Sequence, residues 1–291
     1  SYDVLQEESA YLAGVLAANV WAGNPNRAGS AGASQLLLNP WARSNGWGLA
    51  GSSTLKGVEG MFGNIAGLAH INKTELLFTH TRWLDGSGVD INSVGFGQKL
   101  GDAGVIGLTA TTIGFGDLPV TTFDQPDGGL GTFRPTQANI GLSFAKQFSN
   151  SISGGLLVRV VSESIANVRS SGVCFDAGIQ YVTGPKDNVH FGIALKNVGP
   201  AVNFSGDGLS VQGLLVNGDG EQLSLEQRAA SLELPTMMNI GAAYDFHLQE
   251  NMHRLTVAGN FTSNSFTKDQ FMLGLEYGFR KMLNLRGGYM W

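Results

Sequence analysis

Charged residues are scarce in this sequence. They make up 14% of its 291 residues, against roughly 25% in an average soluble domain, while 43% of the residues are hydrophobic. A surface that faces lipid needs few charges, so the deficit favours a membrane protein. The net charge of −5 also argues against a nucleic-acid partner, because proteins that bind nucleic acids neutralise phosphates with lysine and arginine.

The sequence also lacks a run of the ~18 consecutive apolar residues that a membrane-spanning helix needs. If the chain crosses a membrane, it must do so as a closed β-barrel, because hydrocarbon cannot satisfy the open edge of a sheet. The apolar stretch 10–22 is preceded by Gln6, Glu7 and Glu8, where a signal peptide would carry basic residues. We therefore predict a helix or extension over residues 1–23.

Reactive and metal-binding patterns are missing as well. A single cysteine, Cys174, excludes an intrachain disulfide framework. Because Cys174 and Asp176 are two residues apart, we predict that the cysteine is a small residue on the polar face of a strand. The five histidines show no metal-ligand spacing, and no Gly-x-Ser-x-Gly motif occurs. The stretch 217–221 lacks the ligand spacing of a calcium loop and is interpreted as a solvated turn. We predict no catalytic residue, no metal and no cofactor, although a Ser/His arrangement assembled only in space stays open.

What the sequence does contain is alternation with a period of two. In the stretches 138–145, 238–246 and 271–279, large apolar residues alternate with glycine, serine, asparagine and alanine. This period indicates strands with one apolar face and one small or polar face. A soluble sandwich would carry abundant lysine, glutamate and threonine on its outer face, whereas small polar residues suit a crowded, hydrated lumen. We predict an all-β protein, a transmembrane antiparallel β-barrel over residues 74–291.

Eleven strands follow from this pattern. They are expected at 74–84, 89–99, 104–115, 137–148, 152–163, 172–183, 189–198, 234–246, 252–263, 268–279 and 282–291. Short turns alternate with wider links, among them 164–171, as short periplasmic turns alternate with extracellular loops in outer-membrane barrels. Because such barrels have even strand counts, we expect further strands, either outside this sequence or hidden from the pattern.

Residues 24–73 are rich in glycine, alanine, serine and asparagine and show no sustained alternation. So long an irregular stretch is unusual for a loop, and a plug inside the barrel lumen would explain it. We expect inward charges on the strands to pair with each other and with this plug, holding Arg43 and Glu59 in place; a polar route for a solute is the alternative. The strand charges concerned are Glu75, Arg159, Glu163, Asp176, Lys196, Asp245, Arg254, Glu276 and Arg286.

Several short motifs run through this segment: Leu36-Leu37-Leu38, Ala42-Arg43, Gly46-Trp47-Gly48, Gly57-Val58-Glu59 and Asn64-Ile65-Ala66-Gly67-Leu68. In them the chain resembles the PorV/PorQ family of Bacteroidetes outer-membrane proteins, with PorV the nearer of the two. It departs from the family pattern at Trp47 and at Ile65, where the family has proline. The resemblance implies a FadL-like barrel of fourteen strands, in which Arg43, Glu59, Asn64 and Gly67 belong to the plug.

The resemblance also implies a function and a location. PorV-like proteins belong to the type IX secretion system of the bacterial outer membrane, with their loops extracellular. The implied partners are the large translocon barrel protein of that system, cargo proteins with a C-terminal signal domain, and outer-membrane lipid. The alternative is a transporter of hydrophobic small molecules, as FadL-type barrels are.

Two long links, 116–136 and 199–233, mix apolar side chains with acidic ones. Because loops on a rigid scaffold usually carry the function, we predict that they bind the protein partner. The apolar run 214–216 either folds over the barrel mouth or meets a protein. A short helix is expected within 221–232. The predicted contact residues are Phe123, Phe133, Phe204, Leu209 and Leu214.

Overall fold

The computed structural model describes residues 23–214, 222–248, 252–280 and 282–291. The helix or extension predicted for residues 1–23 lies outside the described residues except for Gly23. The solvated turn predicted at 217–221 and residues 215–216 of the apolar run lie outside them too.

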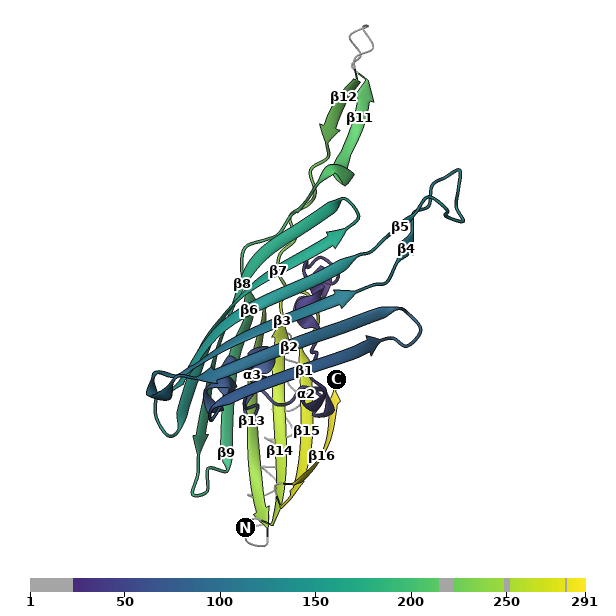
Figure 1. Ribbon diagram of the computed structural model, residues 1–291. Coiled ribbons are helices and arrows are strands. Elements are labelled where there is room, and N and C mark those ends of the chain that lie inside the picture. The colour runs from purple at the N-terminus through teal and green to yellow at the C-terminus, as the bar shows by residue number, and fades with distance from the viewer. Residues whose placement is uncertain (1–22, 215–221, 249–251, 281) are drawn as a thin grey trace, which may run out of the picture.

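A single antiparallel sheet dominates the fold (Figure 1). Eleven long strands follow one another in it in chain order, and each pairs with its sequence neighbours among them. This confirms the all-β, antiparallel fold class. The strands are β1 (Thr74–Trp83), β2 (Val89–Lys99), β3 (Val105–Gly114), β6 (Thr136–Gln147), β7 (Ile152–Ile165), β8 (Val168–Thr183), β9 (Val189–Val198), β13 (Met237–Leu248), β14 (His253–Asn264), β15 (Gln270–Phe279) and β16 (Leu283–Met290).

The predicted strands agree with the observed ones except near one link. The wide link expected at 164–171 is wrong, because β7 and β8 run on until Ile165 pairs with Val168. Only Ala166 and Asn167 remain as the turn, with Ala166 in the left-handed region at φ 49°. The ends of these two strands are rich in serine and lack the apolar alternation. Backbone hydrogen bonds do not require that alternation, so the ladder continues beyond it.

Short strands also form within the two long links. β4 (Leu118–Pro119) pairs with β5 (Thr132–Phe133), β10 (Phe204–Ser205) pairs with β8, and β11 (Ser210–Leu214) pairs with β12 (Gln222–Glu226). The helix predicted within 221–232 is therefore wrong, because β12 gains ladder bonds from β11. The β4–β5 and β11–β12 hairpins project beyond the ends of the long strands (Figure 1).

The outward face of the sheet is apolar. On β6, for example, Ile140, Leu142 and Phe144 are all exposed, while Gly141 and Ser143 between them are buried. The same pattern recurs on β7, β8, β9 and β15, and on β1 the inward residues are half-buried. So large an exposed apolar surface indicates contact with lipid. None of the helices in the described ranges is long and apolar enough to cross a membrane.

The sheet curves around the segment before β1 (Figure 1). Within the residues that the structure describes, no ladder joins β1 to β16. The eleven long strands described here do not reach the fourteen that the family resemblance implies.

Residues 24–73 lie against the inner face of this sheet and are called the plug below. They form η1 (Pro25–Arg27), η2 (Ser34–Leu37), α2 (Ala42–Gly46), α3 (Gly60–Gly63) and η3 (Ile65–His70). Plug residues Val58, Met61 and Leu68 pack in one buried cluster with Val105 and Leu157 of the wall. Small inward residues make this possible: a Cβ added at Gly95 of β2 would overlap the side chain of Val58.

Candidate functional site

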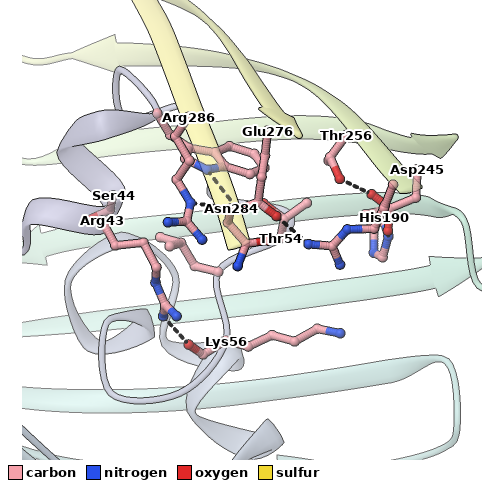
Figure 2. A pocket seen from close by; sticks show the side chains of 13 residues that line it. Arg43, Ser44, Thr54, Lys56, His190, Asp245, Thr256, Glu276, Asn284 and Arg286 are labelled. Carbon is pink, nitrogen blue, oxygen red and sulfur yellow. Dashed lines mark hydrogen bonds and ion pairs between the residues drawn. The ribbon is translucent and has the colours of Figure 1, made fainter. Parts of the chain in front are cut away.

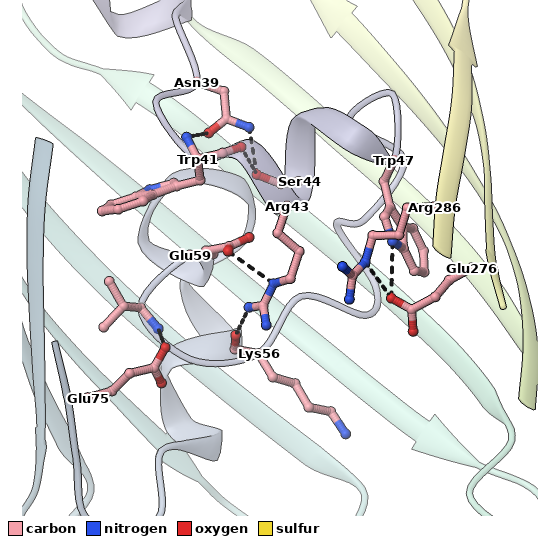
Figure 3. A network of polar contacts seen from close by, with 11 residues as sticks. Asn39, Trp41, Arg43, Ser44, Trp47, Lys56, Glu59, Glu75, Glu276 and Arg286 are labelled. Carbon is pink, nitrogen blue, oxygen red and sulfur yellow. Dashed lines mark hydrogen bonds and ion pairs between the residues drawn. The ribbon is translucent and has the colours of Figure 1, made fainter. Parts of the chain in front are cut away.

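Arg43 and Glu59 hold two turns of the plug together. Arg43 Nε lies 3.0 Å from Glu59 Oε1, and Arg43 Nη2 donates to the Lys56 carbonyl at 3.2 Å (Figure 3). The partners differ in burial: the Glu59 side chain is 7% exposed, that of Arg43 44%. Burial raises the pKa of Glu59 above its usual value, against the opposing effect of Arg43. The ion pair is therefore the means by which a buried carboxylate is tolerated within the plug.

Asn64 and Gly67 fix the plug against the wall. The Asn64 side chain accepts from Ala66 N–H at 3.1 Å and donates to the carbonyls of Ser52 at 2.9 Å and Ile179 of β8 at 3.0 Å. Gly67 lies so close to Leu55 that an added Cβ would overlap the Leu55 carbonyl oxygen. Both residues serve packing and hydrogen bonding within the plug, and neither lines a cavity described below.

Inward charges of the wall form two groups. In the first, Arg159 Nη2 lies 3.2 Å from Asp176 Oδ2, and it also donates to the Met61 carbonyl of the plug. Asp176 also accepts from Asn197 N–H at 2.7 Å. In the second group, Glu276 accepts from three donors, which are Trp47 Nε1, Arg254 Nη2 and Arg286 Nε. Figure 3 shows the contacts with Trp47 and Arg286. The expected pairing of wall charges with one another is found in these two groups. Arg43 and Glu59, however, pair with each other inside the plug, and no ion pair joins them to a strand charge among the described residues.

Two of the cavities between the plug and the wall are large enough to hold a small molecule, and they share Ser44 and Leu55 in their linings. The first, here called the polar cavity, measures about 240 Å³ and is lined mainly by charged and polar side chains (Figure 2). The second, here called the mixed cavity, also measures about 240 Å³. Its apolar lining comprises Leu37, Leu49, Leu55, Phe62, Met237, Met272 and Met290, and its polar lining includes Asn39, Asn239, Asn260, Thr262, Asn264 and Lys196.

Lys196 of β9 is the unusual member of the mixed cavity. It is 4% exposed, and its ammonium lies 4.0 Å from the centroid of the Phe62 ring. Among the residues described, no carboxylate oxygen lies within 4.0 Å of that ammonium. The nearby carboxylate of Asp176 pairs with Arg159 instead. The alternation of β9 placed Lys196 inward, but it could not show that this lysine would have no carboxylate partner.

His70 makes the seating of the plug sensitive to acid. Its ring nitrogens lie 3.1 Å from Gln147 Nε2 and 3.4 Å from Ser153 Oγ of the wall. Burial, reinforced by the charges of Lys56 and His190, lowers the pKa of His70 from 6.5 to about 4. Between pH 6.5 and pH 4, His70 binds a proton more readily in the unfolded state than in the folded state. Its contribution to the free energy of unfolding is therefore fully present above pH 6.5 and is lost as the pH drops toward 4.

We therefore expect the free energy of unfolding to fall by up to about 3 kcal/mol between pH 7 and pH 4 through His70 alone. Urea unfolding of the chain in detergent, repeated with the His70→Gln variant, would isolate this contribution as the difference between the two pH profiles. Parallel profiles for the two proteins would contradict it.

The predicted partner-binding residues do not form one cluster. Phe123, between β4 and β5, is fully exposed, whereas Phe133, Phe204 and Leu209 are half-buried in β5, β10 and η5 (Asp207–Leu209). Leu214 is placed by its backbone, which pairs with Gln222 across the β11–β12 hairpin. Phe123 and Phe133 therefore belong to the β4–β5 hairpin and Leu214 to the β11–β12 hairpin, whereas Phe204 lies in β10, which pairs with β8 of the main sheet.

The described ranges contain no group of three or more histidine, cysteine, aspartate or glutamate residues that could hold a metal ion. Cys174 is fully buried, on the inward face where the alternation predicted it. The asparagines of the mixed cavity were not singled out in advance. Their signal is visible in the sequence, because Asn239, Asn260 and Asn264 all fall on the polar face of β13 or β14.

Comparison with known proteins shows similarity at the level of solved structures. No protein-family model matches the chain, and no curated protein matches its sequence. The Pseudomonas putida toluene transporter TodX aligns over 85% of this chain and 82% of its own, at 13% identity and a TM-score of 0.47. The monoaromatic hydrocarbon channel CymD aligns over 85% and 91%, at 11% identity and a TM-score of 0.42.

A Pseudomonas aeruginosa FadL homologue aligns over 85% of this chain and 78% of its own, at 13% identity and a TM-score of 0.44. At these identities and TM-scores, the assignment of the fold rests on the strand ladders and the lipid-facing surface described above. The solved structures to which the chain is similar thus include a transporter, a channel and a FadL homologue.

Proposed function

We propose that this chain is an outer-membrane barrel that binds a hydrophobic small molecule with an anionic head group in the mixed cavity. The observation that carries this proposal is Lys196, a buried ammonium with no carboxylate within ion-pair distance, at the edge of an apolar cavity. The proposal is the transporter alternative drawn from the sequence, with the ligand class narrowed by this lysine.

The lining of the mixed cavity suits such a ligand. Ligand sites are mostly apolar, with a few polar groups that orient the molecule. Met237, Met272 and Met290 offer flexible, polarisable side chains that adapt to an alkyl or aromatic group. Asn239 of β13 and Asn260 of β14 supply further hydrogen-bonding groups to the lining.

Charge balance explains why the head group should be an anion. Arg159 and Lys196 bring two positive charges to this part of the wall, and Asp176 neutralises one of them. A buried charge without a partner is costly, and the face of the Phe62 ring compensates for it only in part. A carboxylate placed at Lys196 would complete the neutralisation.

A matched pair of ligands tests the proposal. We expect octanoate to bind the purified barrel about tenfold more tightly than octanol, because a charged hydrogen bond contributes about 1.5–3 kcal/mol. Lys196→Met should abolish this preference while leaving octanol binding unchanged. The exposed Lys268 provides the control variant, Lys268→Met. Equal binding of both ligands to the unaltered barrel, measured by calorimetry, would refute the proposal.

Binding of a protein partner is the second candidate function, and Phe123 is the observation that favours it. This side chain is fully exposed in the link between β4 and β5, close to Asp124 and Asp127. An exposed aromatic anchor beside acidic residues suits a protein interface with a basic partner surface. Together with the sequence resemblance to PorV, this supports a role as a type IX secretion component that meets the translocon barrel and cargo signal domains.

Replacing residues 118–133, the hairpin that carries Phe123, by a short turn tests this second candidate. The ladders of the long strands do not involve this hairpin, so the barrel should still fold. If the type IX proposal is correct, delivery of secreted cargo to the cell surface should fail while octanoate binding persists. Normal delivery by a correctly inserted variant would count against the secretion role and leave the small-molecule proposal untouched.

A further inference from the structure

We propose that the polar cavity binds a phosphate group. This site is distinct from the head-group site at Lys196, which lies in the other cavity. It is located at the end of the lumen where the short turns connect the strands, since it is lined by residues near the start of β9, β14 and β16. Figure 2 shows that its side chains converge from the plug and from the wall.

Positive charge exceeds negative charge around this cavity. Its lining includes four permanent cations, Arg43 and Lys56 of the plug and Arg254 and Arg286 of the wall. Two carboxylates also line it, Glu276 and Asp245. Glu59 does not line the cavity but pairs with Arg43, and it is the third carboxylate of this region. Among the side chains that line the cavity two positive charges are in excess, and one of them remains after Glu59 is counted.

The carboxylates are already occupied. Glu276 accepts from Trp47 and from both arginines of the wall, and Asp245 accepts from His190 Nε2 at 3.1 Å and from Thr256. The lining therefore offers donors more readily than acceptors to a molecule that enters the cavity.

Unused donors are present on both sides of the cavity. Lys56 forms no ion pair among the residues described. Arg43 contacts Glu59 and the Lys56 carbonyl through Nε and Nη2, which leaves its Nη1 as a further donor. On the wall, the His190 side chain is 6% exposed, and its Nδ1 is buried without a hydrogen-bond partner within the described structure. Nδ1 donates to an anion when the ring carries both protons. A phosphate group, with several acceptor oxygens pointing in different directions, matches donors that approach from two sides.

Such a ligand would join the plug to the wall. Arg43 and Lys56 belong to the plug, whereas His190 and Arg254 belong to β9 and β14. Since the site exists only when the plug is seated, a bound phosphate should stabilise the folded barrel by mass action.

Calorimetry in a maltoside detergent, which carries no phosphate, tests the inference. Inorganic phosphate is one probe and dihexanoylphosphatidylglycerol the other, so the two arms distinguish a free phosphate from a lipid head group; binding of either supports the site. Lys56→Gln should weaken binding about tenfold, because it removes one charged hydrogen bond. Lys56→Arg should retain binding, and the exposed Lys268→Gln is the control.

Because Lys56 makes no ion pair, its variants should fold normally, and the melting temperature without ligand checks this. Absence of binding by both probes, or an unchanged affinity in Lys56→Gln, would overturn the proposal. Octanoate binding should be the same in Lys56→Gln and the unaltered barrel, so failure here is separable from failure of the proposed function.

Discussion

Replacing Arg159 by methionine is expected to lower the free energy of unfolding by about 3–5 kcal/mol, the larger of the two strongest effects we predict. Both side chains of the Arg159–Asp176 pair are 5% exposed. Methionine fills similar space but leaves Asp176 as a buried carboxylate without its ion-pair partner. The change also removes a hydrogen bond to the Met61 carbonyl, which ties the plug to β7. Urea unfolding in detergent, followed by tryptophan fluorescence, would measure the loss.

A second substitution separates charge from packing. Asp176→Asn retains an oxygen that can accept from Asn197 N–H but carries no charge. The double variant Arg159→Met/Asp176→Asn should therefore recover most of the stability lost in the single variant. If the double variant is as unstable as Arg159→Met, the loss arises from packing, and the argument from buried charge fails.

Replacing Arg43 by methionine is expected to lower the free energy of unfolding by about 3 kcal/mol, and Glu59→Gln should have a smaller effect, about 1 kcal/mol. The asymmetry follows from burial. Removal of Arg43 leaves the buried Glu59 carboxylate without a cation, whereas removal of the Glu59 charge leaves Arg43, which is 44% exposed and reaches water. Equal losses in the two variants would contradict this explanation.

The pH dependence provides an independent check on Arg43. Burial is the largest effect on Glu59 and raises its pKa; without Arg43, only the smaller effect of the Arg286 charge opposes it. When the pKa of a carboxyl group is higher in the folded state than in the unfolded state, the free energy of unfolding of the protein falls as the pH rises from the lower pKa to the higher one. The stability deficit of Arg43→Met should therefore shrink as the pH is lowered toward 4.5. Arg134→Met, in the exposed pair with Asp117, is the matched control and should show no measurable loss at any pH.

The two long links show where prediction from the sequence was limited. Their apolar and acidic character was evident, yet the predicted helix within 221–232 is the strand β12 in the structure. A five-residue strand such as β12 is stabilised by its partner β11, which precedes it in the sequence and contributes ladder bonds that no local pattern records. The same reasoning applies to β7 and β8, whose ladder continues beyond the end of the apolar alternation.

The sequence by itself determined the strands of the wall and the direction in which their side chains point. Both depend on local chemistry, because a period of two separates apolar residues that face lipid from small and polar residues that face the lumen. It also indicated that Arg159, Asp176 and Lys196 face inward. Only the tertiary structure decided which of them pair, because pairing depends on strand register and on the path of the plug. That arrangement joined Arg159 to Asp176 and left Lys196 facing a cavity, with the ring of Phe62 as its neighbour.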